Sequence, residues 1–232
     1  YGWARHDTLG TYQSVASVIE GQFNAVYVVV QRYIGGQWIQ MIERFDNRQF
    51  TYGAEDAWCV DCGIQSTLVY PAANLTISGT TPAPTPTTIP LGTTGSGLVA
   101  TGTATFIANA GVFSGANVGQ ILRVGGGIAT ITQYVSPTQI VGTITQPITA
   151  VLANDPNATP LPATQGNWSL TPQFTTFTGL DYLNGQLVSI NADGGVVTPQ
   201  VVTNGAITLQ QPASKVTVGL AFTCQIQTMP LD

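Results

Sequence analysis

Hydrophobic and polar side chains alternate at a spacing of two residues through most of this chain, and this alternation constrains its fold more than any other feature. Within residues 37–45, Trp38 and Gln40 fall on one side of an extended segment, while Ile39 and Met41 fall on the other. A period of two is typical of a β-strand, whereas an amphipathic helix repeats every 3.6 residues. No stretch of ten residues combines helical spacing with a cap, so the sequence predicts an all-β protein.

Pairs of turn-forming residues separate several of the predicted strands. These pairs are Gly35-Gly36, Asp193-Gly194 and Asn204-Gly205. A two-residue turn of type I′ needs a positive φ at both central positions, which glycine, asparagine and aspartate adopt most readily. Each pair therefore predicts a tight β-hairpin between the strands on either side of it.

Charge divides the chain into two flanks and a middle segment. Most charged residues lie within residues 1–70, whereas residues 71–180 contain only Arg123 and Asp155. Proline, threonine and glycine dominate residues 78–97, and residues 154–167 are rich in turn formers. We therefore expect a small β-module at 78–171, inserted into a discontinuous β-domain of residues 1–77 and 172–232. The domain is predicted to be a β-sandwich or barrel-like.

Inside the middle segment, three strands are predicted, at residues 120–124, 128–135 and 139–144. The first two are separated by Gly125-Gly126-Gly127. These glycines are not followed by the Lys-Ser/Thr of a phosphate-binding loop, and no helix begins there. A β-turn is the simpler interpretation.

The overall charge argues against several functional classes. Only 7% of the residues are charged and the net charge is −5, which supplies no basic field for gripping nucleic acid. The apolar run at 26–30 is far shorter than the roughly 18 residues that a membrane span needs. Tyr1 is not followed by a basic and then an apolar segment, so we expect no signal peptide and interpret the chain as a processed form or an excerpt.

Few side chains suited to catalysis are present, because His6 and Lys215 are the only residues of their types. His6 is next to Asp7, but neighbours on a strand point to opposite faces, so the pair is poorly placed for Ser-His-Asp chemistry. Cys59 and Cys62 have the C-x-x-C spacing of redox or zinc sites. A zinc site needs four ligands, and only Cys224 and His6 remain to complete this pair. In an extended segment, residues three apart also point to opposite faces. We therefore expect no enzyme and no cofactor.

Acidic residues leave one catalytic alternative open. Glu55-Asp56 with Asp61, or Asp193 with Asp181, would suit the paired carboxylates of a glycosidase. The spacing shows nothing about their proximity, and acids beside turn glycines are usually solvated turn formers.

Aromatic side chains suggest a binding alternative, since rings on a β-scaffold can stack on sugars. Trp38 and Trp58 alternate with apolar neighbours, so we expect both in a core. Trp168 lies at the edge of the second turn-rich stretch and is the tryptophan that we expect to be exposed. Tyr134 and Tyr182 complete the candidate contact residues for a ligand or partner.

A series of short motifs lies along both flanks. They occupy residues 1–8, 14–18, 27–32, 42–44 and 55–63 before the middle segment, and 178–185, 192–194, 205–209, 212–214, 218–220 and 229–231 after it. Their order resembles that in long virion proteins of tailed bacteriophages, of the tail-tubular or nozzle type. Residues 112–113, 117–119, 123–127 and 136–139 look like a small β-module inserted in many such proteins.

This resemblance implies a virion component that assembles into a ring of copies around the DNA channel and contacts neighbouring tail or connector proteins. It carries over no catalytic residue. The expected localisation is the phage tail, after synthesis in the bacterial host cytoplasm. A carbohydrate- or receptor-binding β-module remains the alternative.

Overall fold

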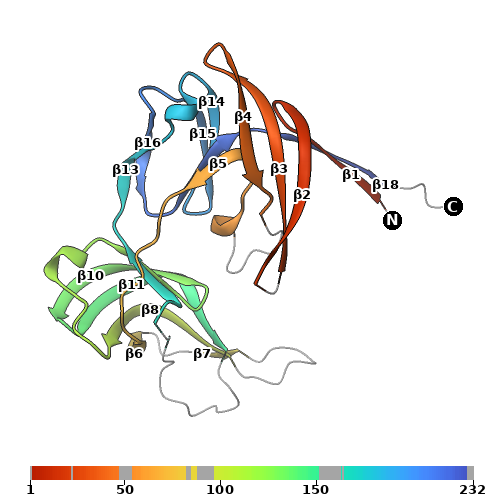
Figure 1. Ribbon diagram of the computed structural model, residues 1–232. Coiled ribbons are helices and arrows are strands. Elements are labelled where there is room, and N and C mark those ends of the chain that lie inside the picture. Colours follow the sequence, from red (N-terminus) through yellow and green to blue (C-terminus); the bar gives the residue numbers. More distant parts are fainter. Residues whose placement is uncertain are drawn as a thin grey trace. The chain divides into compact units, whose positions relative to one another are not determined.

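The computed structural model describes residues 2–21, 23–46, 54–81, 85–87, 97–151, 163 and 165–228. Within these ranges there is no α-helix, and several antiparallel sheets account for the regular structure apart from three short 3-10 turns (Figure 1). The prediction of an all-β protein is therefore confirmed.

Contacts between Cα atoms divide the chain into two compact units. The flank unit comprises Tyr1–Ser66 and Thr175–Asp232, and the inserted unit comprises Thr67–Phe174. The first boundary lies after Ser66 and not after residue 77, the predicted position, which is inside strand β6 (Leu75–Thr81). This strand pairs with β8 (Gly97–Ala108), so its backbone hydrogen bonds commit it to the inserted unit. The second boundary follows Phe174 rather than residue 171.

The inserted unit is one sheet of seven strands, which curls into a half-barrel. Its order is β12-β9-β10-β11-β8-β6, with β7 also paired to β8. Besides β6 and β8, the elements are β7 (Thr85–Thr87), the 3-10 turn η2 (Gly115–Asn117), β9 (Ile121–Val124), β10 (Gly127–Ser136), β11 (Gln139–Val151) and β12 (Trp168–Thr171).

Hydrogen bonds join each end strand of this curled sheet, β6 and β12, to the segment that precedes the other. Leu75 and Ala163 exchange backbone hydrogen bonds of 2.8 and 2.7 Å. Farther along, the Leu170 amide donates to the Val69 carbonyl at 2.9 Å. These bonds give partners to some of the backbone groups that the two end strands would otherwise present to other chains.

The core of the inserted unit lies inside this curl. Every residue of β9 and β12 is buried. The core is formed by large aliphatic and aromatic side chains, among them Leu75, Phe106, Leu122, Ile131, Ile140 and Ile148. Burial of these apolar side chains is the main favourable contribution to folding.

Three glycines are required by geometry in this unit, two in a turn and one where strands approach closely. Gly125 and Gly126 form the turn between β9 and β10 with φ of 54° and 75°, which confirms a β-turn rather than a phosphate cradle. At Gly127 a Cβ atom would lie 2.5 Å from the Cα of Ile148, so the two strands approach too closely for a side chain.

The flank unit contains four sheets, which are the ladder β1-β18, the three-stranded sheet β2-β3-β4, the four-stranded sheet β15-β14-β17-β5 and the pair β13-β16. The elements are β1 (Gly2–Asp7), β2 (Thr11–Glu20), β3 (Phe23–Ile34), β4 (Gln37–Arg44), η1 (Ala54–Asp56), β5 (Asp61–Gln65), β13 (Phe174–Thr178), η3 (Asp181–Leu183), β14 (Leu187–Ala192), β15 (Gly195–Val201), β16 (Ala206–Ala213), β17 (Val216–Leu220) and β18 (Thr223–Thr228).

Two of the three predicted hairpins are confirmed in this unit, whereas at Asn204-Gly205 the tight turn forms with a single bridge, Thr203–Ala206, and the flanking strands β15 and β16 belong to different sheets. Gly35-Gly36 joins β3 to β4, Asp193-Gly194 joins β14 to β15, and Asn204-Gly205 precedes β16. The φ values at these residues lie between 47° and 83°, as a type I′ turn requires.

Replacing Gly127 by alanine is expected to lower the free energy of unfolding by about 1–3 kcal/mol, because the new methyl group would overlap the backbone of Ile148. Gly115→Ala is the control, since its Cβ would have nothing within 4 Å. Urea denaturation followed by circular dichroism measures both variants. Equal stability of the two variants would contradict the close approach.

Candidate functional site

The three-stranded sheet β2-β3-β4 is the most unusual surface of the flank unit. Its central strand contains the β-branched run Val28-Val29-Val30, which suits a pleated sheet. Side chains alternate between two faces. We call the face that carries Val28, Val30 and Arg32 the inner face, and the face that carries Gln31 and Tyr33 the outer face.

Large apolar side chains are exposed on both faces of this sheet. On the inner face Val15 and Ile19 are 71% and 79% exposed, and on the outer face Trp38 and Ile42 are 64% and 77% exposed. Nine of the ten residues of β2 are exposed. Scattered exposed apolar residues are normal, but a concentration on one element marks an interaction site.

Aromatic and amide side chains form two adjacent rows across the outer face. The rings of Tyr33 and Trp38 pair across β3 and β4, with centroids 5.3 Å apart and planes tilted by 57°. In the next row Gln40 donates to Gln13, and Gln13 donates to Gln31, both at 2.7 Å. The amide row connects all three strands of the sheet.

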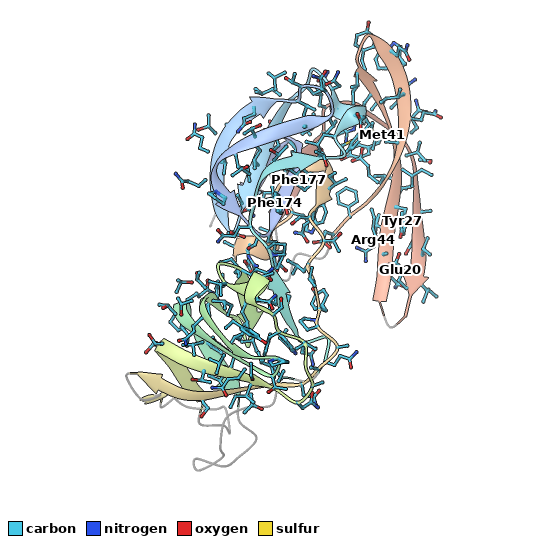
Figure 2. The ribbon with its side chains drawn as sticks, turned by 90° about the vertical axis from the view of Figure 1, so that its left-hand side faces the viewer. Glu20, Tyr27, Met41, Arg44, Phe174 and Phe177 are labelled. Atoms are coloured by element: carbon cyan, nitrogen blue, oxygen red, sulfur yellow. The ribbon has the colours of Figure 1, made fainter. Side chains whose placement is uncertain are left out.

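A charged group ties the same three strands together at the opposite end. Figure 2 shows Glu20, Tyr27 and Arg44 gathered there, with Met41 nearer the other end. The Arg44 guanidinium donates to Glu20 at 2.9 and 3.0 Å, and the Tyr27 hydroxyl also donates to Glu20. The hydrogen bond from Tyr27 lowers the pKa of Glu20 most, and the bonds from Arg44 lower it further. This carboxylate therefore stays ionised.

The inner face is attached to the rest of the unit by a buried ionic cluster. Arg32 makes a bidentate contact with Glu43 at 2.8 Å, donates to the Leu9 carbonyl and lies 3.9 Å from Asp61. The Asp61 carboxylate also accepts a 2.8 Å contact from His6 Nε2. Arg32 is almost fully buried, and its paired carboxylates offset the free-energy cost of removing its charge from water.

His6 is therefore part of a structural cluster, and its partner is not Asp7. Its ring stacks on Phe222 at a centroid distance of 4.1 Å. The sequence argument against a His6-Asp7 pair agrees with this geometry. It missed the contact with Asp61, which is 55 residues away and leaves no local signal.

Cys62 links the inner face to η3. Its Sγ lies 2.8 Å from the Met41 sulfur, its amide donates to Glu43 at 3.2 Å, and its carbonyl accepts from the Tyr182 hydroxyl at 3.0 Å. Burial raises the pKa of the Cys62 thiol to about 12 and also raises the pKa of Tyr182. Both side chains are consequently neutral at physiological pH.

The candidate contact residues predicted from sequence are divided between the two units. Trp168 is 1% exposed and its Nε1 donates to the Ala73 carbonyl at 2.7 Å, so the expectation that it is exposed is wrong. Tyr134 packs against the core of the inserted unit. Tyr182 is half-buried in the flank unit.

The expectation for Trp38 is also wrong, because this ring lies exposed on the outer face. Trp58 is half-buried. Alternation correctly indicates a strand with two different faces, but it does not say which face the rest of the protein covers.

The acidic residues considered for glycoside hydrolysis take part in separate contacts. Asp56 pairs with Lys215, Asp61 with His6, and Asp193 accepts from the backbone amides of Ser214 and Lys215. In the parts of the chain that are described, no group of three or more His, Cys, Asp or Glu is arranged to hold a metal ion. No helix among those residues is long and apolar enough to cross a membrane.

A shallow depression of about 390 Å³ lies on the inserted unit. Apolar side chains including Val69, Val112 and Leu170 line it, with the amides of Asn117 and Gln120. Those amides bond to each other at 3.1 Å, and Gln120 also donates to the Ala116 carbonyl. The depression therefore presents few polar groups that could orient a ligand.

Comparison with known proteins adds no family assignment. No protein-family model matches the chain, and no curated protein matches it significantly. The exposed three-stranded sheet is thus the candidate site on its geometry alone.

Thiol labelling at pH 8 is expected to modify Cys59 and Cys224 well before Cys62. The first two are exposed, whereas a pKa of about 12 leaves roughly one Cys62 thiol in ten thousand ionised. Peptide mass mapping after timed alkylation measures the three rates. Labelling of Cys62 as fast as Cys59 would show a reactive C-x-x-C pair and contradict this structural role.

Proposed function

We propose that this chain is a structural component of a bacteriophage tail, of the nozzle or tail-tubular type, and that it works by assembly rather than by catalysis. The observation that carries the proposal is the three-stranded sheet with large apolar side chains exposed on both faces, such as Val15, Ile19 and Ile42. Burial of such side chains against neighbouring subunits would remove them from water, at about 25 cal/mol for each Å².

The proposed partners are further copies of this chain and adjacent tail or connector proteins. The ordered motifs of both flanks, and their resemblance to virion proteins of tailed phages, support this choice over other assemblies. The net charge of −5 supports a role that does not depend on gripping nucleic acid. The proposed location is the virion tail, after synthesis in the host cytoplasm.

Immunogold electron microscopy tests the proposal. Antibodies against this chain are expected to label the tails of particles produced by the phage that encodes it, and mass spectrometry of purified particles should detect the chain. Pre-immune serum is the control. Presence of the chain in infected cells combined with its absence from purified particles would contradict a virion role.

A glycan-binding function is the second candidate, and the exposed Tyr33-Trp38 pair favours it. Two neighbouring rings can stack on a sugar, and the adjacent row of Gln13, Gln31 and Gln40 offers amides for hydroxyl groups. This site lies on the flank unit, whereas Trp168 is buried in the inserted unit.

Titration with host polysaccharide, followed by tryptophan fluorescence, separates the two candidates. Assembly alone predicts no saturable change. Glycan binding predicts a saturable change that Trp38→Ala abolishes and Ile42→Ala retains, because Ile42 is exposed on the same face but outside the ring pair.

A further inference from the structure

The outer edge of β2 is an open β-strand edge. Within the described residues, β2 pairs with β3 alone, so the backbone groups on its other side have no strand partner. Exposure of nine of its ten residues shows that side chains from the rest of the unit do not cover it either. Such an edge is a template for one more strand.

β2 also has few of the features that usually protect an edge, because its one bulge lies near its start, between Tyr12 and Ser14, outside residues 14–20. Residues 11–20 contain no lysine, proline or glycine, and the single charge, Glu20, is at the end. Other edges of the chain are shorter or protected: β15 contains Pro199, β5 has five residues, and β4 ends in Glu43 and Arg44. β2 is therefore the long neutral edge of the flank unit.

The sequence of β2 is complementary to itself in one antiparallel register. Pairing within one sheet places residues of the same face opposite each other. With Ser17 opposite Ser17 of a second copy, Val15 meets Ile19 on the inner face and Ala16 meets Val18 on the outer face. Shifting the register by two residues in one direction places Ile19 opposite Ser17 and Ala16 opposite Glu20, and shifting it in the other places Val15 opposite Ser17 and Ile19 opposite Gln13, so both shifts lose the Val15-Ile19 pairs.

Charge allows the same register. Glu20 would lie opposite Ser14 of the second copy, so no like charges meet. Glu20 is already bonded to Tyr27 and Arg44 in its own sheet, and it therefore needs no cation from a partner. A neutral strand is the occupant that suits this edge.

We infer that β2 pairs with β2 of a second copy of this chain, joining two three-stranded sheets into one continuous antiparallel sheet of six strands. The pairing satisfies the open edge and brings Val15 of one copy beside Ile19 of the other, two of the most exposed apolar side chains among the described residues. This inference rests on the proposed assembly function. Because antiparallel pairing of identical strands is two-fold symmetric, it specifies a contact that joins copies in pairs and is separate from any contact that closes a ring.

Disulfide formation tests the register. In a chain carrying Cys59→Ser and Cys224→Ser, Ser17→Cys is expected to form a dimer on mild oxidation, because directly opposed Cα atoms lie about 4.5–5.5 Å apart, within disulfide range. Ser14→Cys is the matched control. Its own copy would lie six residues along the partner strand, roughly 20 Å away, so it should not cross-link.

Light scattering tests the contact without cross-linking. The wild-type chain of 24.3 kDa is expected at twice that mass. Val15→Lys should raise the dimer dissociation constant at least about tenfold, since each dimer has two Val15-Ile19 pairs. Val196→Lys is the control: Val196 is 92% exposed on β15, and the same substitution there should leave the dimer intact.

A monomeric wild-type chain, cross-linking through residue 14 but not 17, or dissociation by Val196→Lys but not Val15→Lys would each overturn the inference. If gold label marks the tail while the β2 variants change nothing, the tail function stands and this contact is wrong. If β2 pairs as described but particles lack the chain, the contact stands and the tail function is wrong.

Discussion

Backbone hydrogen bonding at sheet edges is the constraint on which the rest of this structure depends. Without α-helices in its described part, the chain must satisfy its N–H and C=O groups mainly through strand pairing. In the inserted unit, bonds such as those between Leu75 and Ala163 satisfy part of the end strands as well. The flank unit distributes its strands over four small sheets and retains the open edge of β2. The two units thus differ in how far their sheet edges are hydrogen-bonded, and the flank unit is the one that would gain from a partner strand.

The scarcity of charge reinforces this difference. Lys215, the single lysine, is buried beside Asp56, and Arg32 is buried between Glu43 and Asp61. These cations hold elements of the flank unit together, so they are not available to protect strand edges. Removing one partner from such a buried pair typically costs about 3–5 kcal/mol. The few cations of the flank unit therefore stabilise its fold through internal ion pairs, and none of them lies on β2.

Local patterns made the fold class and the tight turns predictable. The burial of individual side chains depends on tertiary contacts, so it could not be predicted. Period-two alternation and pairs such as Asp193-Gly194 act within a few residues, so the sequence displays them directly. The burial of Trp168 depends on the Ala73 carbonyl, 95 residues away. The exposure of Trp38 depends on which face the unit covers. For the candidate site, alternation indicated the strands but not that β2 lies at an edge.

The polar rows across the three-stranded sheet explain how an exposed element keeps its shape before a partner binds. A small sheet with little buried area has limited stability by itself, and exposed ion pairs such as Glu20-Arg44 add little to it. Together with the Gln13-Gln31-Gln40 row, however, they connect all three strands at two levels and fix their register. A strand already held in an extended conformation loses less conformational entropy on pairing. Rigidity of this sheet therefore favours assembly through its edge.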